Sequence, residues 1–179
     1  MLFTSYTDSL PQDGKVMVVT SGYVANEAIN FDSLIDGKIV DVNKDGISTL
    51  NVTELTLTAG GSSSNDQTTS SQVLSSFTSG DTGLYIFDKT NLDRFMAFDA
   101  FEPLENLLPE DVAGEHAAFS RDGKTYAVSL AGLGLVEKYN FTIDELYAAV
   151  IFDRPLDDTD EKTKQLADNA KVLLCELFK

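Results

Sequence analysis

The sequence predicts an α/β fold: a three-layer sandwich built on a mixed, partly parallel sheet. Short apolar runs rich in β-branched residues alternate with amphipathic segments along the chain. The 179 residues, of which 42% are hydrophobic, are enough to bury one core and too few for two comfortable domains. No internal repeat is visible. We therefore expect a single domain over residues 14–179, preceded by a tether at 1–13.

Three runs predict the parallel part of the sheet. Lys15 to Thr20 (KVMVVT) and Gly83 to Asp88 (GLYIFD) are short, apolar and bounded by glycine or polar residues, as buried strands are. Thr49 to Thr58 is a third strand, in which the apolar positions change face near Thr53, so that it is either buried on both faces or carries a bulge. Helices should link these strands by right-handed crossovers.

Apolar residues at three- and four-residue spacing predict the helices. The first spans Val24 to Ile35, and the second begins near Asp66 after a mobile loop and ends at Gly80. Thr90 begins a third helix. The C-terminal helix begins with a capping box, and its inner stripe is Leu166, Ala170, Leu173, Leu174 and Leu177.

The second half of the chain predicts shorter elements. The Pro-containing segment FEPLENLLPED favours short helical turns. Two extended segments flank Asp122 and Gly123, and Glu145 to Phe152 is the last strand.

The net charge of -16 disfavours nucleic acids and anionic lipid surfaces as partners. Cys175 is the only cysteine, so no intrachain disulfide forms, and its apolar helical position predicts a structural role. The sequence contains no run of about 18 apolar residues, so it predicts no membrane span. The opening MLFTSYTDSLPQDGK is typical of a short apolar remnant and a polar tether, as expected if an export or anchor segment has been removed.

One stretch resembles a known family. SGDTGLYIFDKTNLDRFMAFDAFEPLENLLP is similar to the amino-terminal lobe of bacterial extracytoplasmic solute-binding proteins, and GKVMVVTSGY and GKTYAVSL are similar to other phrases of that lobe. The resemblance implies a fold like one lobe of a periplasmic binding protein. It also implies a non-catalytic role outside the cytoplasm, membrane-anchored, with a small solute or a protein of a membrane transport complex as partner. The second lobe of such receptors is missing here.

The rule for open α/β sheets places a ligand beyond the carboxyl ends of the parallel strands. The residues that follow those ends are Ser21, Gly22, Tyr23, Asp88 and Asn91. The structural alternative, which we favour, is that Tyr23 packs over the sheet edge and Asp88 caps the next helix.

The stretch DVNKDGISTL resembles the start of a calcium loop. Asp41, Asn43, Asp45 and the Ile47 carbonyl stand where such a loop has its first oxygen ligands, and Gly46 stands at the glycine position. The bidentate acid is missing, because its position is occupied by Val52. This favours a structural turn, and a weak calcium site in a surface or scaffold module remains the alternative.

No catalytic constellation is evident. His116 is the only histidine, and nothing near Ser120 builds a nucleophile elbow. The glycine-rich phosphate-binding motifs are absent. We expect no enzymatic activity and no required cofactor.

Overall fold

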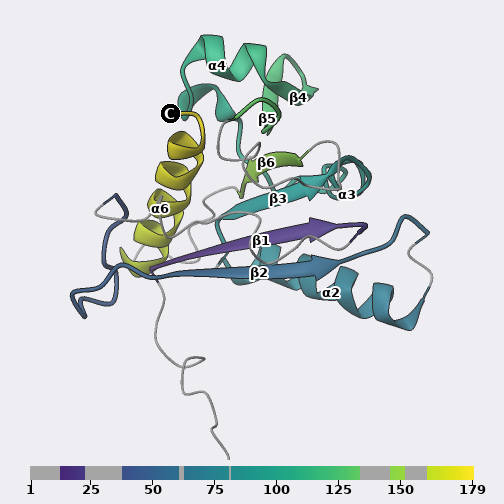
Figure 1. Cartoon of the computed structure of the whole chain (residues 1–179), viewed down its shortest axis with the longest axis horizontal. Coiled ribbons are helices and arrows are strands. Elements are labelled where there is room, and N and C mark those ends of the chain that lie inside the picture. The colour runs from purple at the N-terminus through teal and green to yellow at the C-terminus, as the bar shows by residue number, and fades with distance from the viewer. Residues whose placement is uncertain (1–12, 23–37, 61–62, 81, 134–145, 152–160) are drawn as a thin grey trace, which may run out of the picture.

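The computed structural model describes residues 13–22, 38–60, 63–80, 82–133, 146–151 and 161–179 (Figure 1). These residues form a six-stranded sheet with the order β2-β1-β3-β6-β5-β4. β2 (Leu50–Thr56), β1 (Gly14–Thr20) and β3 (Leu84–Asp88) are parallel. β6 (Leu146–Val150), β5 (Lys124–Ser129) and β4 (Ala117–Arg121) continue the sheet with antiparallel pairings. The predicted mixed, partly parallel sheet is confirmed.

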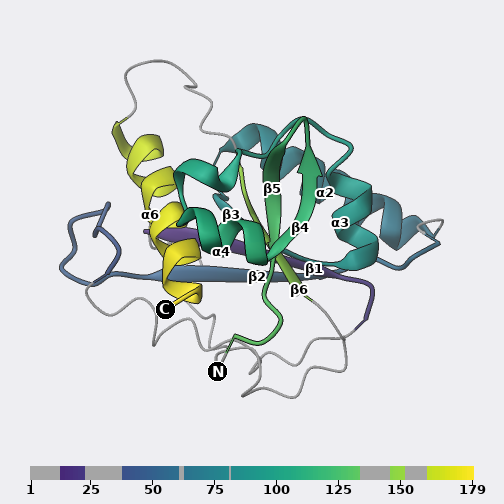
Figure 2. The same cartoon turned by 90° about the horizontal axis from the view of Figure 1, so that it is seen from above.

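Helices cover both faces of the sheet and make the predicted three layers. On one face, α6 (Glu161–Leu177) packs with the short helices η2 (Leu104–Asn106) and α4 (Glu110–Glu115). On the other face, α2 (Ser64–Ser79) and α3 (Lys89–Phe95) cover β1, β3 and β6. Figure 2 shows α2 and α3 together, apart from α6.

The two central parallel strands are apolar on both faces because both faces are covered. Val16 and Val18 of β1 contact the α6 side, and Met17 and Val19 contact the α2 side. The α2 side is largely aromatic. Its rings, 5.2 to 5.9 Å apart in edge-to-face or stacked pairs, belong to Phe77, Tyr85, Phe87, Phe95 and Phe101.

Most predicted boundaries are close, and the helix starts need correction. α2 begins at Ser64, with Ser63 as N-cap, two residues before the predicted start, and Gly80 ends it at φ 68° as expected. α3 begins at Lys89 with Asp88 as N-cap, so Thr90 is not its first residue. The predicted helix Val24 to Ile35 and the capping box before α6 lie outside the described residues.

The two Asp-Gly pairs behave differently. Asp122 (φ 52°) and Gly123 (φ 74°) form the tight turn that joins β4 to β5, as two-residue hairpins require. Asp45 and Gly46 belong to the segment 38–49, which contains no strand, so this pair forms a turn before β2 and does not join two strands. Both alternatives predicted for this strand are wrong: β2 keeps a regular register with β1 and has no bulge, and none of its residues is buried, because it is an edge strand.

A close approach of helix and strand fixes the position of α6. A Cβ atom added to Gly83, just before β3, would lie 2.3 Å from the Cβ of Ala170 in α6. Only glycine opposite a small residue allows this contact. Ala170, Leu173, Leu174 and Leu177 of the predicted stripe are buried, and α6 crosses the sheet near the amino ends of the parallel strands (Figure 1).

We therefore expect Gly83→Ala to destabilise the fold by about 1–3 kcal/mol, because the added methyl group forces helix and strand apart. Urea unfolding measures the change. Combining it with Ala170→Gly should cost less than the sum of the two single variants. Gly114→Ala in α4, where an added Cβ meets nothing within 4 Å, is the matched control and should not destabilise. Strict additivity of Gly83→Ala and Ala170→Gly would refute the contact.

Candidate functional site

The carboxyl ends of the parallel strands meet at one edge of the sheet. From β1 the chain passes to β2 on one side, and then returns through α2 to β3 on the other side of β1. The strand order therefore reverses between β1 and β3, and this switch point is where open α/β sheets bind ligands. Ser21 follows β1 and Asp88 ends β3, so Ser21, Asp88 and Asn91 of the predicted set are brought together here.

A carboxylate joins the two strand ends. Oδ2 of Asp88 accepts hydrogen bonds from the backbone N–H and the hydroxyl of Ser21, both at 2.5 Å. Oδ1 accepts from the backbone N–H and the side-chain amide of Asn91, at 2.9 and 3.0 Å. Asp88 and Asn91 are buried, at 4% and 0% exposure. Asp88 thus acts as the helix cap that we favoured, and both its oxygens already have partners.

Ser21 and Gly22 are the accessible members of the predicted set. Both are half-buried, and the Gly22 carbonyl accepts a hydrogen bond from the hydroxyl of Thr20 at 2.7 Å. Tyr23 lies outside the described residues. Asp88 holds Ser21 by two hydrogen bonds, and both Asp88 and Asn91 are buried, so among the described members of the set only Ser21 and Gly22 offer accessible surface to a ligand.

The sequence did not reveal Arg94, which ties β2 to the same edge. Its guanidinium donates to the carbonyls of Thr58 (3.0 Å) and Ala59 (3.3 Å) and to Oδ1 of Asn91 (3.3 Å). The side-chain amide of Asn91 in turn donates to the Leu57 carbonyl at 3.2 Å. The spacing of three residues between Asn91 and Arg94 on α3 was the available signal.

Asp66 also anchors the end of β2. It accepts hydrogen bonds from the backbone N–H and hydroxyl of Thr58 at 3.0 and 2.9 Å, and from the hydroxyl of Ser63 at 2.5 Å. These bonds, that of Ser63 first, lower the pKa of Asp66 to about 2. The carboxyl edge is therefore held by two buried carboxylates, Asp66 and Asp88.

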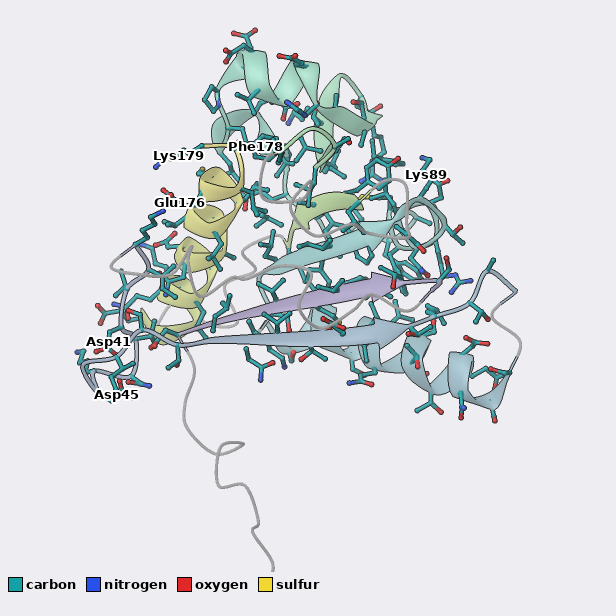
Figure 3. All side chains as sticks on the ribbon, in the orientation of Figure 1. Asp41, Asp45, Lys89, Glu176, Phe178 and Lys179 are labelled. Carbon is teal, nitrogen blue, oxygen red and sulfur yellow. The ribbon has the colours of Figure 1, made fainter. Side chains whose placement is uncertain are left out.

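The calcium-like stretch folds into a tight turn around one side chain. The Asp41 carboxylate accepts from the backbone N–H groups of Lys44 (2.6 Å), Asp45 (3.3 Å) and Gly46 (2.7 Å). Asn43 accepts from the Asp45 N–H at 2.8 Å, and Asp45 accepts from the Ile47 N–H at 2.9 Å. Figure 3 shows Asp41 and Asp45 near each other, far from Lys89 on α3. The turn is a self-contained network of side chain to backbone bonds.

Two buried polar residues clamp this turn to the body. Asp13, which the sequence assigned to the tether, is fully buried and accepts from the N–H groups of Val42 (2.7 Å) and Thr49 (2.7 Å). Asn169 of α6, at 1% exposure, donates to the carbonyls of Asp13 (2.7 Å) and Val40 (2.8 Å) and accepts from the Val40 N–H (2.8 Å). The polar Asn169 beside the apolar stripe of α6 was the signal for this role.

The turn lacks the ligands of a closed metal site. Val52 occupies the position of the bidentate acid and is 38% exposed. Within the described residues, no group of three or more histidine, cysteine, aspartate or glutamate side chains is placed to hold a metal ion. If each binds through one oxygen, as in calcium loops, Asp41, Asn43, Asp45 and the Ile47 carbonyl supply about four ligands, fewer than the six to eight or so that calcium takes, so water or another chain would have to complete a site.

The remaining candidate groups have structural contacts. His116 ends α4 and makes an edge-to-face contact with Phe178 at 5.1 Å, while Ser120 is exposed on β4. Cys175 is half-buried and donates to the Leu107 carbonyl at 3.1 Å, and burial raises the pKa of its thiol.

Comparisons with family models, with curated proteins and with solved structures return no match.

The lowered pKa of Asp66 predicts how the stability of the fold depends on pH. Because it is lower in the folded chain than the ordinary value of 3.8, the folded state binds the proton more weakly than the unfolded state does. The stability that ionised Asp66 contributes should be present at neutral pH and be lost as pH falls from about 4 to about 2.

Urea unfolding of the wild type and Asp66→Asn at several pH values measures this contribution. The difference in unfolding free energy should shrink over that acid window. Asp111→Asn, an exposed carboxylate on α4, is the control and should leave the acid limb unchanged. A difference that is constant with pH would contradict the assignment.

Proposed function

We propose that this chain is a non-catalytic binding domain that works outside the cytoplasm, as an accessory solute- or partner-binding component of a membrane transport complex. The observation that carries the proposal is the switch point between β1 and β3. There Ser21 and Gly22 stay partly exposed, and two hydrogen bonds to the buried Asp88 fix the position of Ser21, which is how a preorganised binding corner is built. The resemblance to one lobe of solute-binding proteins supports the same role.

The corner has a defined chemical preference. The hydroxyl of Ser21 donates its hydrogen to Asp88, so only its lone pairs remain for a ligand. The Gly22 carbonyl also offers a lone pair. Both outward atoms are therefore acceptors, in a chain whose net charge is -16. A small solute that carries ammonium or hydroxyl donors fits this corner best.

The proposal places the domain on the outer side of a membrane through an N-terminal anchor. None of the described helices is long and apolar enough to cross a membrane. The partner would then be another component of the same membrane complex.

A thermal-shift screen of small amines, amino acids and polyols tests solute binding. A true ligand should raise the melting temperature of the wild type by mass action, and Ser21→Ala should abolish the rise because an acceptor is lost. Ser120→Ala, which removes an exposed hydroxyl on β4, is the matched control. Ligands that stabilise all three proteins equally would exclude this corner, and hydrolytic turnover abolished by a His116 variant would overturn the non-catalytic role.

A calcium-dependent surface or scaffold module is the second candidate function. The observation that favours it is the orientation of Asp41, Asn43 and Asp45 within one turn by five backbone N–H bonds. Asp13 and Asn169 hold that turn on the body of the domain, so a bound ion would stabilise the attachment between the turn and α6.

Melting in chelator and then across a calcium titration tests this candidate. Binding should raise the melting temperature in the millimolar range, where incomplete extracellular sites bind, and Asp45→Ala should remove the effect. Asp93→Ala, an exposed aspartate on α3, controls for loss of charge. If calcium up to about 10 mM shifts nothing, the segment is a structural turn.

A further inference from the structure

Among the residues that the structure describes, the outer edge of β2 is a regular strand edge with no neighbouring strand. β2 is the outermost strand in Figure 1, and within the described part of the chain it pairs with β1 alone. Its seven residues, LNVTELT, keep an unbroken register with β1 and contain neither proline nor lysine. The opposite edge, β4, is interrupted by two register shifts and ends in Arg121. Proteins usually protect exposed edges by such devices, and of these β2 carries only the charged side chain of Glu54.

The hydrogen bonds next to the two ends of β2 show which of its backbone N–H and C=O groups point away from the sheet. The Leu57 N–H donates to the Thr20 carbonyl at 2.8 Å, and the Thr49 carbonyl accepts from the Asp13 N–H at 3.0 Å. The N–H and C=O groups of odd-numbered residues in this segment therefore point towards β1. The even-numbered residues Val52, Glu54 and Thr56 direct theirs away from the sheet. Among the described residues, these outward peptide groups have no hydrogen-bond partner.

The side chains along this edge are also accessible. Val52, Glu54 and Thr56 lie on the α6 side and are exposed. Leu55 lies on the α2 side, where it packs half-buried against the aromatic cluster. An added strand would thus meet one apolar side chain and one carboxylate on one face, and a leucine on the other.

We propose that the outer edge of β2 is a docking site for an extended, basic segment of another polypeptide, which adds a seventh strand to the sheet. Such β-augmentation takes its affinity from the main-chain ladder and its selectivity from alternate side chains. Glu54 stands at the centre of the edge and makes no ion pair within the described residues. A lysine or arginine of the partner strand beside Glu54 would form an ion pair with it. The net charge of -16 attracts such a basic segment.

A second copy of this chain is the weaker occupant. Antiparallel pairing of two β2 strands would place two Glu54 carboxylates on the same face of the joint and would bring together two chains of net charge -16. Glu54 therefore discourages self-pairing while it favours a basic partner. This edge is separate from the Ser21 corner, so the inference stands whether or not a solute binds there.

Amide hydrogen exchange measured by NMR tests the inference. The probe is a capped seven-residue peptide that alternates lysine with valine or threonine. The amides of Val52, Glu54 and Thr56 should exchange about tenfold more slowly at a peptide concentration ten times the dissociation constant, since exchange then occurs from the free fraction. The amides of the odd-numbered residues, already bonded to β1, should change little.

Two peptides and three variants complete the design. A peptide with glutamate in place of lysine should bind several-fold more weakly, and one of equal charge with alternate prolines should not bind, because it cannot form the ladder. Val52→Pro removes an outward N–H at an edge position that tolerates proline, and should abolish binding. Glu54→Gln should weaken binding of the lysine peptide, whereas Glu115→Gln, an exposed acid on α4, should not.

Several results would overturn the proposal. If the proline-containing peptide binds equally well, or if a folded Val52→Pro variant binds as the wild type does, net charge alone explains the binding and no strand is added. Protection of the same amides without peptide, rising with protein concentration, would assign the edge to a second copy. Unchanged exchange of the three amides at saturating lysine peptide would show that the edge takes no strand. If Val52→Pro fails to fold, the peptide pair and the comparison of Glu54→Gln with Glu115→Gln still decide the outcome.

Discussion

The close contact between α6 and the sheet is the constraint on which one whole side of this domain depends. Gly83 has no side chain where the Cβ of Ala170 approaches, and this lets α6 lie directly on the start of β3. From that position α6 reaches several separate segments. Asn169 holds the calcium-like turn, and Glu176 forms an ion pair with Lys38 at 2.7 Å. Hydrogen bonds from Lys179 and Lys38 lower the pKa of Glu176, which keeps it charged in this role.

Two carboxylates hold together the carboxyl ends of the parallel strands, at the end of the sheet away from α6. Asp88 connects the ends of β1 and β3, and Asp66 fixes the end of β2. Asp88 is the N-cap of α3, and Asp66 lies in the first turn of α2. Both are buried, and several N–H and O–H donors match the negative charge of each, so neither needs a counter-ion to be stable there. The polar residues of the switch point serve the fold first. A ligand would meet the surface that they shape, namely Ser21 and Gly22, and would not meet the acids themselves.

The candidate sites show how differently their parts can be predicted. The positions of Ser21, Asp88 and Asn91 follow from strand order, because parallel strands bring their carboxyl ends to one edge. Asp13, Asn169 and Arg94 could not be found in this way, since each contacts residues far away in the sequence. The open edge of β2 was equally hidden, because a strand's neighbours are not written in its own residues. Its apolar pattern showed only that it was a strand.

The sequence by itself determined the class of fold, the strands and most of the helices, because period, β-branching and capping residues act locally. It also determined the turn chemistry of the two Asp-Gly pairs, although only the tertiary structure decided which pair joins two strands. The order of the strands, the antiparallel placement of β6 beside β3, and the partners of the buried polar groups were decided by tertiary packing. These depend on which faces must be buried together, and that is a property of the assembled layers and of no single segment.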